Sequence, residues 1–130
     1  MEVQVAALCD AAADYAGKLS ILGVFDTIFT AGLPAVQPQC AVALRMVFRK
    51  EEEGVHPIVI NFVDADGRAV LPALEAAIEV SMPAEVEFVT RNVVLNIQHA
   101  RFENVGTYAV DVLVAGRHIA SIPLQVRAVG

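Results

Sequence analysis

Strict alternation of apolar and polar residues recurs along this chain, and it limits the fold more than any other feature. The clearest run places Cys40, Val42, Leu44, Met46 and Phe48 on one face. Shorter runs of the same kind lie at 58–62, 93–97, 108–114 and 120–126. Because successive side chains of a β-strand point to opposite faces, such runs indicate strands with one buried face. The chain is therefore predicted to be all-β.

Turn residues separate these runs at short intervals. Tyr15-Ala16-Gly17-Lys18 divides predicted strands at about 2–11 and 18–29, and Glu51 to Gly54 divides strands at 39–50 and 55–64. Asp64-Ala65-Asp66-Gly67 and Ala115-Gly116-Arg117 have the composition of hairpin turns, which need positive φ angles. This spacing predicts an antiparallel, immunoglobulin-like or Greek-key β-sandwich of seven or eight strands.

Two segments need a choice between alternatives. Pro72 to Val80 is compatible with a helix that has proline in its first turn, but its alternating Leu74, Ala76 and Ile78 favour a strand. Pro123 lies inside the last predicted strand and cannot donate a ladder hydrogen bond. We therefore expect that strand to lie at an edge or to carry a bulge.

Composition and charge narrow the function classes. A chain of 130 residues, 56% of them apolar, is expected to form a single domain over residues 1–130 with a sizeable core. Its formal net charge of −6 and scattered basic residues argue against nucleic acid and anionic membranes as partners. The start of the chain lacks an export signal, and prolines interrupt the long uncharged stretch 27–44, so we expect a cytoplasmic protein.

The residues that carry catalysis or bind metals form no recognisable site. Cys9 and Cys40 are expected to be reduced, buried thiols with a structural role. The three histidines have no ligand spacing among themselves, and a hairpin turn accounts for Asp64 and Asp66 without calcium. We predict no catalytic residue, no metal site and no cofactor, and lean against an enzyme.

One polar arrangement stands out among the predicted strands. Asn92, Asn96 and Gln98 fall on the same face of one strand. Their amides can donate and accept hydrogen bonds to a ligand or to the backbone of a partner. An ordinary solvated sheet face is the competing interpretation. These residues are the candidate binding residues of this sequence.

Two resemblances support the predicted fold. Gly106 to Val112 resembles the penultimate strand of immunoglobulin-like and fibronectin-type sandwiches, in which a tyrosine such as Tyr108 ties its hydroxyl to the preceding loop. The whole chain resembles a small bacterial family of uncharacterised proteins of about this length. The motifs that carry this second resemblance are Cys9-Asp10, Gly17-Lys18-Leu19, Gly23-Val24-Phe25-Asp26, Gln39-Cys40, Asn61-Phe62-Val63-Asp64 and Ile122-Pro123-Leu124. The resemblance implies a β-sandwich and no particular chemistry.

The sequence does not identify the biological process or the ligand. We hypothesise a non-catalytic protein-binding or assembly module that presents a sheet face or edge to an unknown protein partner. The alternative is a small enzyme or ligand-binding domain with a loop-built site at one end of the sandwich. A symmetric homodimer is also expected, through an Ala/Val-rich face or through the strand Val3 to Leu8, which has no proline or lysine to protect its edge.

Overall fold

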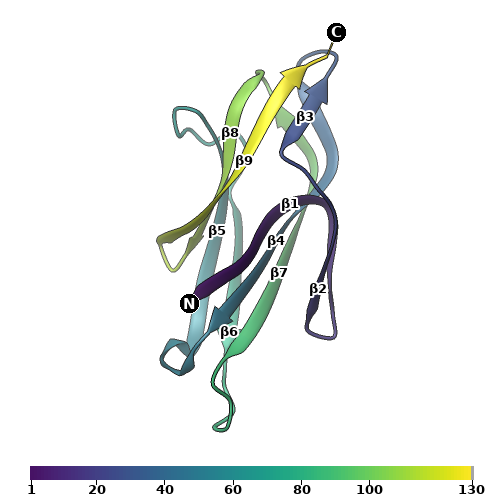
Figure 1. Ribbon diagram of the computed structural model, residues 1–130. Helices are drawn as coiled ribbons and strands as arrows, with labels where there is room; N and C mark the ends of the chain where they lie inside the picture. The colour runs from purple at the N-terminus through teal and green to yellow at the C-terminus, as the bar shows by residue number, and fades with distance from the viewer. Residues whose placement is uncertain (130) are drawn as a thin grey trace.

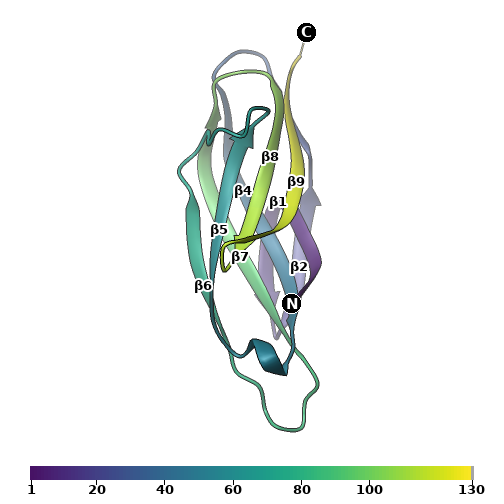
Figure 2. The ribbon, with the colours of Figure 1, turned by 90° about the vertical axis from the view of Figure 1, so that its left-hand side faces the viewer.

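The computed structural model describes residues 1–129, and within them the chain forms nine β-strands in two sheets that pack face to face (Figures 1 and 2). The four-stranded sheet has the order β2-β1-β4-β7, with bounds Lys18–Val24, Glu2–Tyr15, Ala35–Phe48 and Val89–Phe102. The five-stranded sheet has the order β3-β9-β8-β5-β6, with bounds Thr27–Thr30, Arg117–Ala128, Gly106–Val114, Gly54–Asp64 and Leu74–Val80. Consecutive strands repeatedly change sheets, as in β4 to β5 and β6 to β7, which is the Greek-key arrangement of immunoglobulin-like folds.

The core lies between the sheets and is built from the alternating runs. Cys40, Val42, Leu44, Met46 and Phe48 are all buried on the inner face of β4. Inward residues of β5, β8 and β9 face them from the other sheet and complete one apolar cluster. The predicted all-β sandwich is therefore confirmed, with nine strands in the described part of the chain rather than seven or eight.

The extra strand arises because the predicted strand at 18–29 is two strands in different sheets. β2 pairs with β1, whereas β3 pairs in parallel with β9. The chain crosses between the sheets at Phe25 and Asp26: the Phe25 N–H donates to the Leu8 carbonyl in one sheet, and the Asp26 carbonyl accepts from Gln125 in the other. The crossing depends on the pairing of Phe25 with Leu8 and of Asp26 with Gln125, which lie elsewhere in the sequence, so the local pattern alone does not reveal it.

The β1–β2 hairpin folds back over the outer face of the four-stranded sheet. β1 pairs with β4 only as far as Cys9–Ala41, and its remaining residues pair with β2 alone. Ala41 and Ala43 point outward from β4, yet both are fully buried, because the hairpin residues Leu19 and Ile21 pack on this side. Figure 1 shows the hairpin lying alongside β7 and β4.

The two segments with alternative predictions are both resolved. Leu74–Val80 is a strand, as favoured. β3 pairs with β9 only from Gln125 onward, so Pro123 lies on a locally open edge of β9, and β9 also has a register shift opposite Val112 and Leu113. Pro123 therefore lies at an edge, the first of the two expected placements, and the register shift lies away from the proline.

Tyr108 and Asp64 have the local roles that the sequence predicts. The Tyr108 hydroxyl donates to the Asn104 carbonyl at 2.6 Å, and its ring packs edge-on against Phe102. Asp64 Oδ1 accepts hydrogen bonds from the backbone of Asp66 and Arg68, both at 2.9 Å. The carboxylate of Asp64 therefore closes the turn.

Candidate functional site

The three candidate amides share the outer face of β7, but their environments differ. Asn92 is half-buried, and its side chain accepts a hydrogen bond from Arg45 Nη1 at 2.8 Å. Its amide nitrogen donates to Asp14 Oδ2 at 2.9 Å and to the Gly17 carbonyl at 3.2 Å. Asn92 thus fastens the tip of the β1–β2 hairpin to the sheet.

Arg45, on the neighbouring strand β4, adds further hydrogen bonds to this cluster of Asn92, Asp14 and Gly17, which we call the hairpin latch. Its Nη1 also donates to the Gly17 carbonyl at 3.0 Å, and its Nε donates to Gln4 Oε1 at 3.0 Å. The hydrogen-bonding capacity of Asn92 is therefore used within the chain. Asn96 and Gln98 are exposed, and within residues 1–129 neither side chain has a hydrogen-bond partner.

β7 itself is an edge strand along its whole length. It pairs with β4 from Val89 to Phe102, and among the described residues no strand pairs with its other side. Figure 2 shows β7 and β6 as the strands that border this open side of the sandwich. An unpaired edge presents backbone N–H and C=O groups to any strand that can reach it.

The two ends of β7 are protected, and its middle is not. Arg91 pairs with Met46, so it lies on the inner side of the sheet, and an inward charge is a common guard of edge strands. His99 has a φ of 55° and stands opposite Pro38, where the ladder between β4 and β7 is interrupted. Between these two positions, Asn92–Gln98 is a regular strand with an open edge.

Backbone direction follows from the pairing across the sheet. The Leu8 carbonyl points away from β4, toward Phe25. The directions of backbone N–H and C=O groups alternate along a strand of an antiparallel ladder. The backbone groups of Val42, which is paired with Leu8, therefore point toward β7, and those of Leu95 point back toward Val42. The backbone groups of Val94 and Asn96 therefore point out of the open edge.

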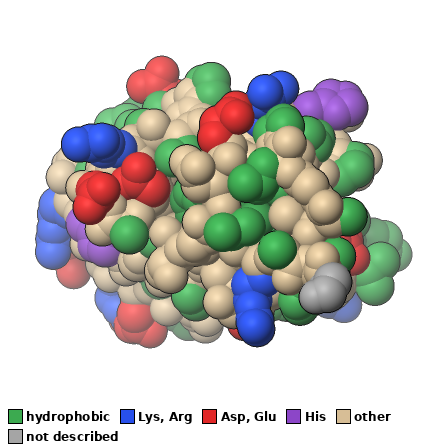
Figure 3. All heavy atoms as spheres, turned by 90° about the horizontal axis from the view of Figure 1, so that it is seen from above, with side chains coloured by type: hydrophobic (Ala, Val, Ile, Leu, Met, Phe, Trp, Pro, Cys, Tyr) green, Lys and Arg blue, Asp and Glu red, His purple; other side chains and the backbone are tan. Residues whose placement is uncertain are grey.

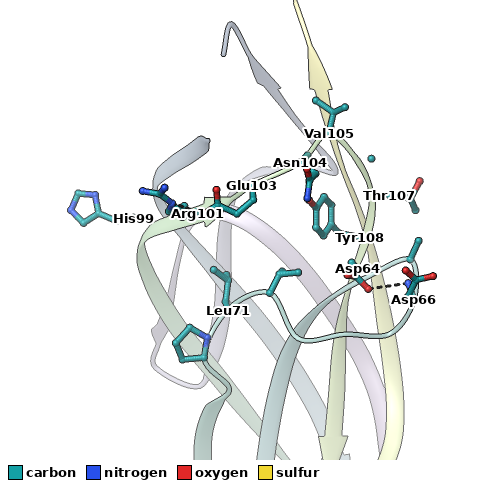
Figure 4. A pocket seen from close by; sticks show the side chains of 14 residues that line it. Asp64, Asp66, Leu71, His99, Arg101, Glu103, Asn104, Val105, Thr107 and Tyr108 are labelled. Atoms are coloured by element: carbon teal, nitrogen blue, oxygen red, sulfur yellow. Dashed lines mark hydrogen bonds and ion pairs between the residues drawn. The ribbon is translucent and has the colours of Figure 1, made fainter. Parts of the chain in front are cut away.

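A groove borders the upper part of this edge. Next to Asn96–Ala100 it encloses about 250 Å³ and is lined on the far side by Phe62, Leu71 and Leu74. It continues into a wider depression of about 600 Å³ at the end of the sandwich, between the β5–β6 and β7–β8 connections (Figure 4). Leu71, Pro72 and His99 line both parts.

The wider depression contains charged groups, but most are already engaged. Arg101 Nε pairs with Glu103 Oε1 at 2.7 Å, and Asp64 and Tyr108 make the bonds described above. Figure 4 shows His99 and Arg101 at one side of the depression and Asp64 and Asp66 at the other. His99 is therefore not placed to act on a neighbouring nucleophile.

A second polar cluster lies on the outer face of the five-stranded sheet. Asp111 Oδ1 accepts from the Ser121 hydroxyl at 3.0 Å and lies 3.4 Å from His118 Nε2. A nucleophilic serine must donate to the base, whereas here both side chains converge on the same carboxylate oxygen. The three residue types of a catalytic triad are present without its geometry.

The two cysteines are buried thiols, as the sequence predicts. Burial raises the pKa of Cys40 to about 11, with smaller contributions from Cys9 and Asp10. Burial also raises the pKa of Cys9, and the nearby Asp10 adds to this. Both thiols are therefore protonated and poorly reactive at neutral pH.

The described residues contain neither a helix long and apolar enough to cross a membrane nor a group of three or more metal-ligating side chains. The spacing of the histidines in the sequence does not single out His99. The signal that marks it is the break in alternation, since Ile97 and Ala100 both face the core.

The chain is similar in structure to the Pseudomonas fluorescens alkylpurine DNA glycosylase AlkC, solved bound to DNA containing an abasic site analog, with a TM-score of 0.50 and 12% sequence identity. The similarity covers 98% of this chain and 30% of the glycosylase chain, so it concerns the sandwich fold. No curated protein matches the sequence. A family model matches residues 4–127, and the chain thus belongs to DUF6941, a family of unknown function.

Proposed function

We propose that this protein is a non-catalytic binding module that presents the open edge of β7 to a strand of another polypeptide. The observation that carries the proposal is the unguarded stretch Asn92–Gln98 between Arg91 and His99. An added strand pairs with the outward backbone groups of such an edge, and side-chain contacts supply specificity. Asn96 and Gln98 offer exposed amides on one side of the edge, and Leu74 borders the groove on the other.

A ligand-binding site in the end depression is the second candidate. His99 lines this depression together with carboxylates, which is the combination expected of a loop-built site. It ranks second because Asp64 and Glu103 already have partners, and His99 lies at the exposed margin.

Binding of DNA, as in the glycosylase structure, is not proposed for this chain. The formal net charge is −6. Figure 3, a view onto the end that carries the C-terminus, shows basic side chains dispersed among acidic and hydrophobic ones. Binding of polyanions depends on clustered lysine and arginine.

The test uses proline, which blocks an edge without breaking the ladder behind it. Asn96→Pro removes an N–H that points out of the open edge, so the pairing of β7 with β4 is kept. Ala6→Pro is the matched control at the opposite side of the same sheet. The Ala6 backbone also points to an open edge, and a groove of about 290 Å³ beside it leaves room for the ring.

Tagged forms of the protein are purified from cells that naturally contain it, and bound polypeptides, including untagged copies, are quantified by mass spectrometry. Wild type and Ala6→Pro are expected to retain the same polypeptides, and Asn96→Pro is expected to lose them while it keeps the wild-type circular dichroism spectrum. Retention of every polypeptide by a folded Asn96→Pro variant would overturn the proposal.

A further inference from the structure

The unguarded stretch of β7 has an approximate mirror pattern about Leu95. The sequence from 91 to 99 is Arg-Asn-Val-Val-Leu-Asn-Ile-Gln-His. Positions equally distant from Leu95 carry similar side chains in three of the four cases. The matched positions are Val93 with Ile97, Asn92 with Gln98, and Arg91 with His99; Val94 with Asn96 is the mismatch.

Such a pattern is what a strand needs to pair with a second copy of itself. In a two-fold symmetric antiparallel pair, a residue at a given distance before the centre lies opposite the residue at the same distance after it. With Leu95 at the centre, apolar Val93 lies opposite Ile97 of the other copy, and the Asn92 amide lies opposite Gln98. Cross-strand neighbours of matching character stabilise a sheet.

The backbone geometry agrees with this centre. The backbone groups of Val94 and Asn96 point out of the open edge. In the symmetric pair, Val94 of one copy lies opposite Asn96 of the other, and the two exchange backbone N–H···O=C bonds. The backbone groups of Leu95 point toward Val42 of the same chain. The two copies of Leu95 therefore face each other as a non-hydrogen-bonded pair, the kind in which side chains approach most closely.

The positions of Arg91 and His99, which protect the two ends of the open edge, also agree with symmetric pairing about Leu95. In the symmetric arrangement Arg91 of one copy lies opposite His99 of the other, so both guards stand at the limits of the paired stretch. The groove beside Asn96–Ala100 then receives the Arg91 end of the second copy. An unrelated partner strand would impose no symmetry on this segment.

We infer that a second copy of this chain is the strand that β7 accepts. This inference rests on the proposed function and names its partner. The two four-stranded sheets join into one continuous sheet of order β2-β1-β4-β7-β7-β4-β1-β2, with the two-fold axis through Leu95. The expected dimer therefore forms through β7 rather than through Val3 to Leu8.

The first experiment measures mass by sedimentation at micromolar concentration. Wild type and Ala6→Pro are expected at twice the 13.9 kDa of one chain, and Asn96→Pro at 13.9 kDa. A wild-type mass of 13.9 kDa throughout would overturn the dimer, and so would a dimer abolished by Ala6→Pro and kept by Asn96→Pro.

The second experiment tests the register with single cysteines. In a non-hydrogen-bonded pair the Cα atoms are about 4.5 Å apart, within the range of a disulfide. Leu95→Cys is therefore expected to give a disulfide-linked dimer under mild oxidation. Val93→Cys is the matched control, because the two copies of residue 93 are offset by four positions, roughly 13 Å along the strand. The native thiols are buried and do not compete.

The outcomes separate this inference from the proposed function. Cross-linking at 95 and not at 93 supports the inference, whereas equal or absent cross-linking overturns it. If Leu95→Cys does not fold, the sedimentation result for Asn96→Pro decides. A monomeric wild type that still loses bound polypeptides on Asn96→Pro substitution would refute self-pairing and leave the proposed function standing, and a monomer with no such loss would refute both.

Discussion

The two outer edges of the four-stranded sheet are built differently. At one side, β2 covers β1 from Cys9 onward, and the register shift between Val3 and Val5 distorts the short part that stays open. At the other side, no strand within residues 1–129 covers the edge of β7, and Asn92–Gln98 is regular between Arg91 and His99. Val3 to Leu8 has the more apolar sequence, yet β7 offers the longer straight edge. The proposed acceptance of a strand by β7 thus rests on the absence of cover between Arg91 and His99 among the described residues, and not on an apolar composition.

The largest effect on stability is expected at Gly23, which lies in β2, the strand that pairs with the outer side of β1. Gly23 has a φ of 70°, and a Cβ there would lie 2.9 Å from Asp10 Cγ. Gly23→Ala combines left-handed backbone strain with a steric clash and should lower the free energy of unfolding by about 2–4 kcal/mol. Chemical denaturation measures this loss, and hydrogen exchange should rise first in β2.

Gly32→Ala is the control, since a Cβ at Gly32 would meet no atom of the described residues within 4 Å. If Gly23→Ala were as stable as wild type, the hairpin would not be held in this position, and the two edges would be more alike than we describe.

A smaller effect is expected from the latch that joins the hairpin to β7. Asn92→Ala removes one hydrogen bond each from Asp14 and Arg45, which keep their bonds to Gly17 and Gln4, and should cost about 1–3 kcal/mol. Asn96→Ala, on the same face of the same strand, removes an exposed side chain and should change stability by less than about 0.5 kcal/mol. Thermal or urea unfolding of the two variants compares them directly. Equal costs would contradict the division of the amides into a structural one and two exposed ones.

The smallest effect is a gain in stability, and it is expected at His99, which ends the open edge of β7. A histidine at a φ of 55° is strained, and asparagine adopts this conformation more easily. His99→Asn should therefore raise the free energy of unfolding by about 0.5 kcal/mol and keep the kink that ends the open edge. His118→Asn, at a histidine outside the positive-φ positions, should give no gain. A loss of stability at His99 would mean that its imidazole makes stabilising contacts.

The fold class followed from the sequence because its determinants are local. Alternation in 40–48 and 108–114 and the turn residues at 15–18 and 115–117 predicted strands and hairpins that the structure confirms. The Tyr108 anchor was predictable for the same reason, since its partner Asn104 is four residues away. The split of 18–29 was not predictable, because it depends on pairing with Leu8 and Gln125, far along the chain.

The candidate site also has some features that follow from the local sequence and others that depend on distant segments. The sequence by itself determined that Asn92, Asn96 and Gln98 share one face, and it contains the mirror pattern about Leu95. Only the tertiary structure decided that Asn92 is used by Asp14, 78 residues away, and that β7 lies at an edge. Side-chain direction within a strand follows from backbone geometry two residues at a time, whereas an open edge exists only where no distant segment pairs with it.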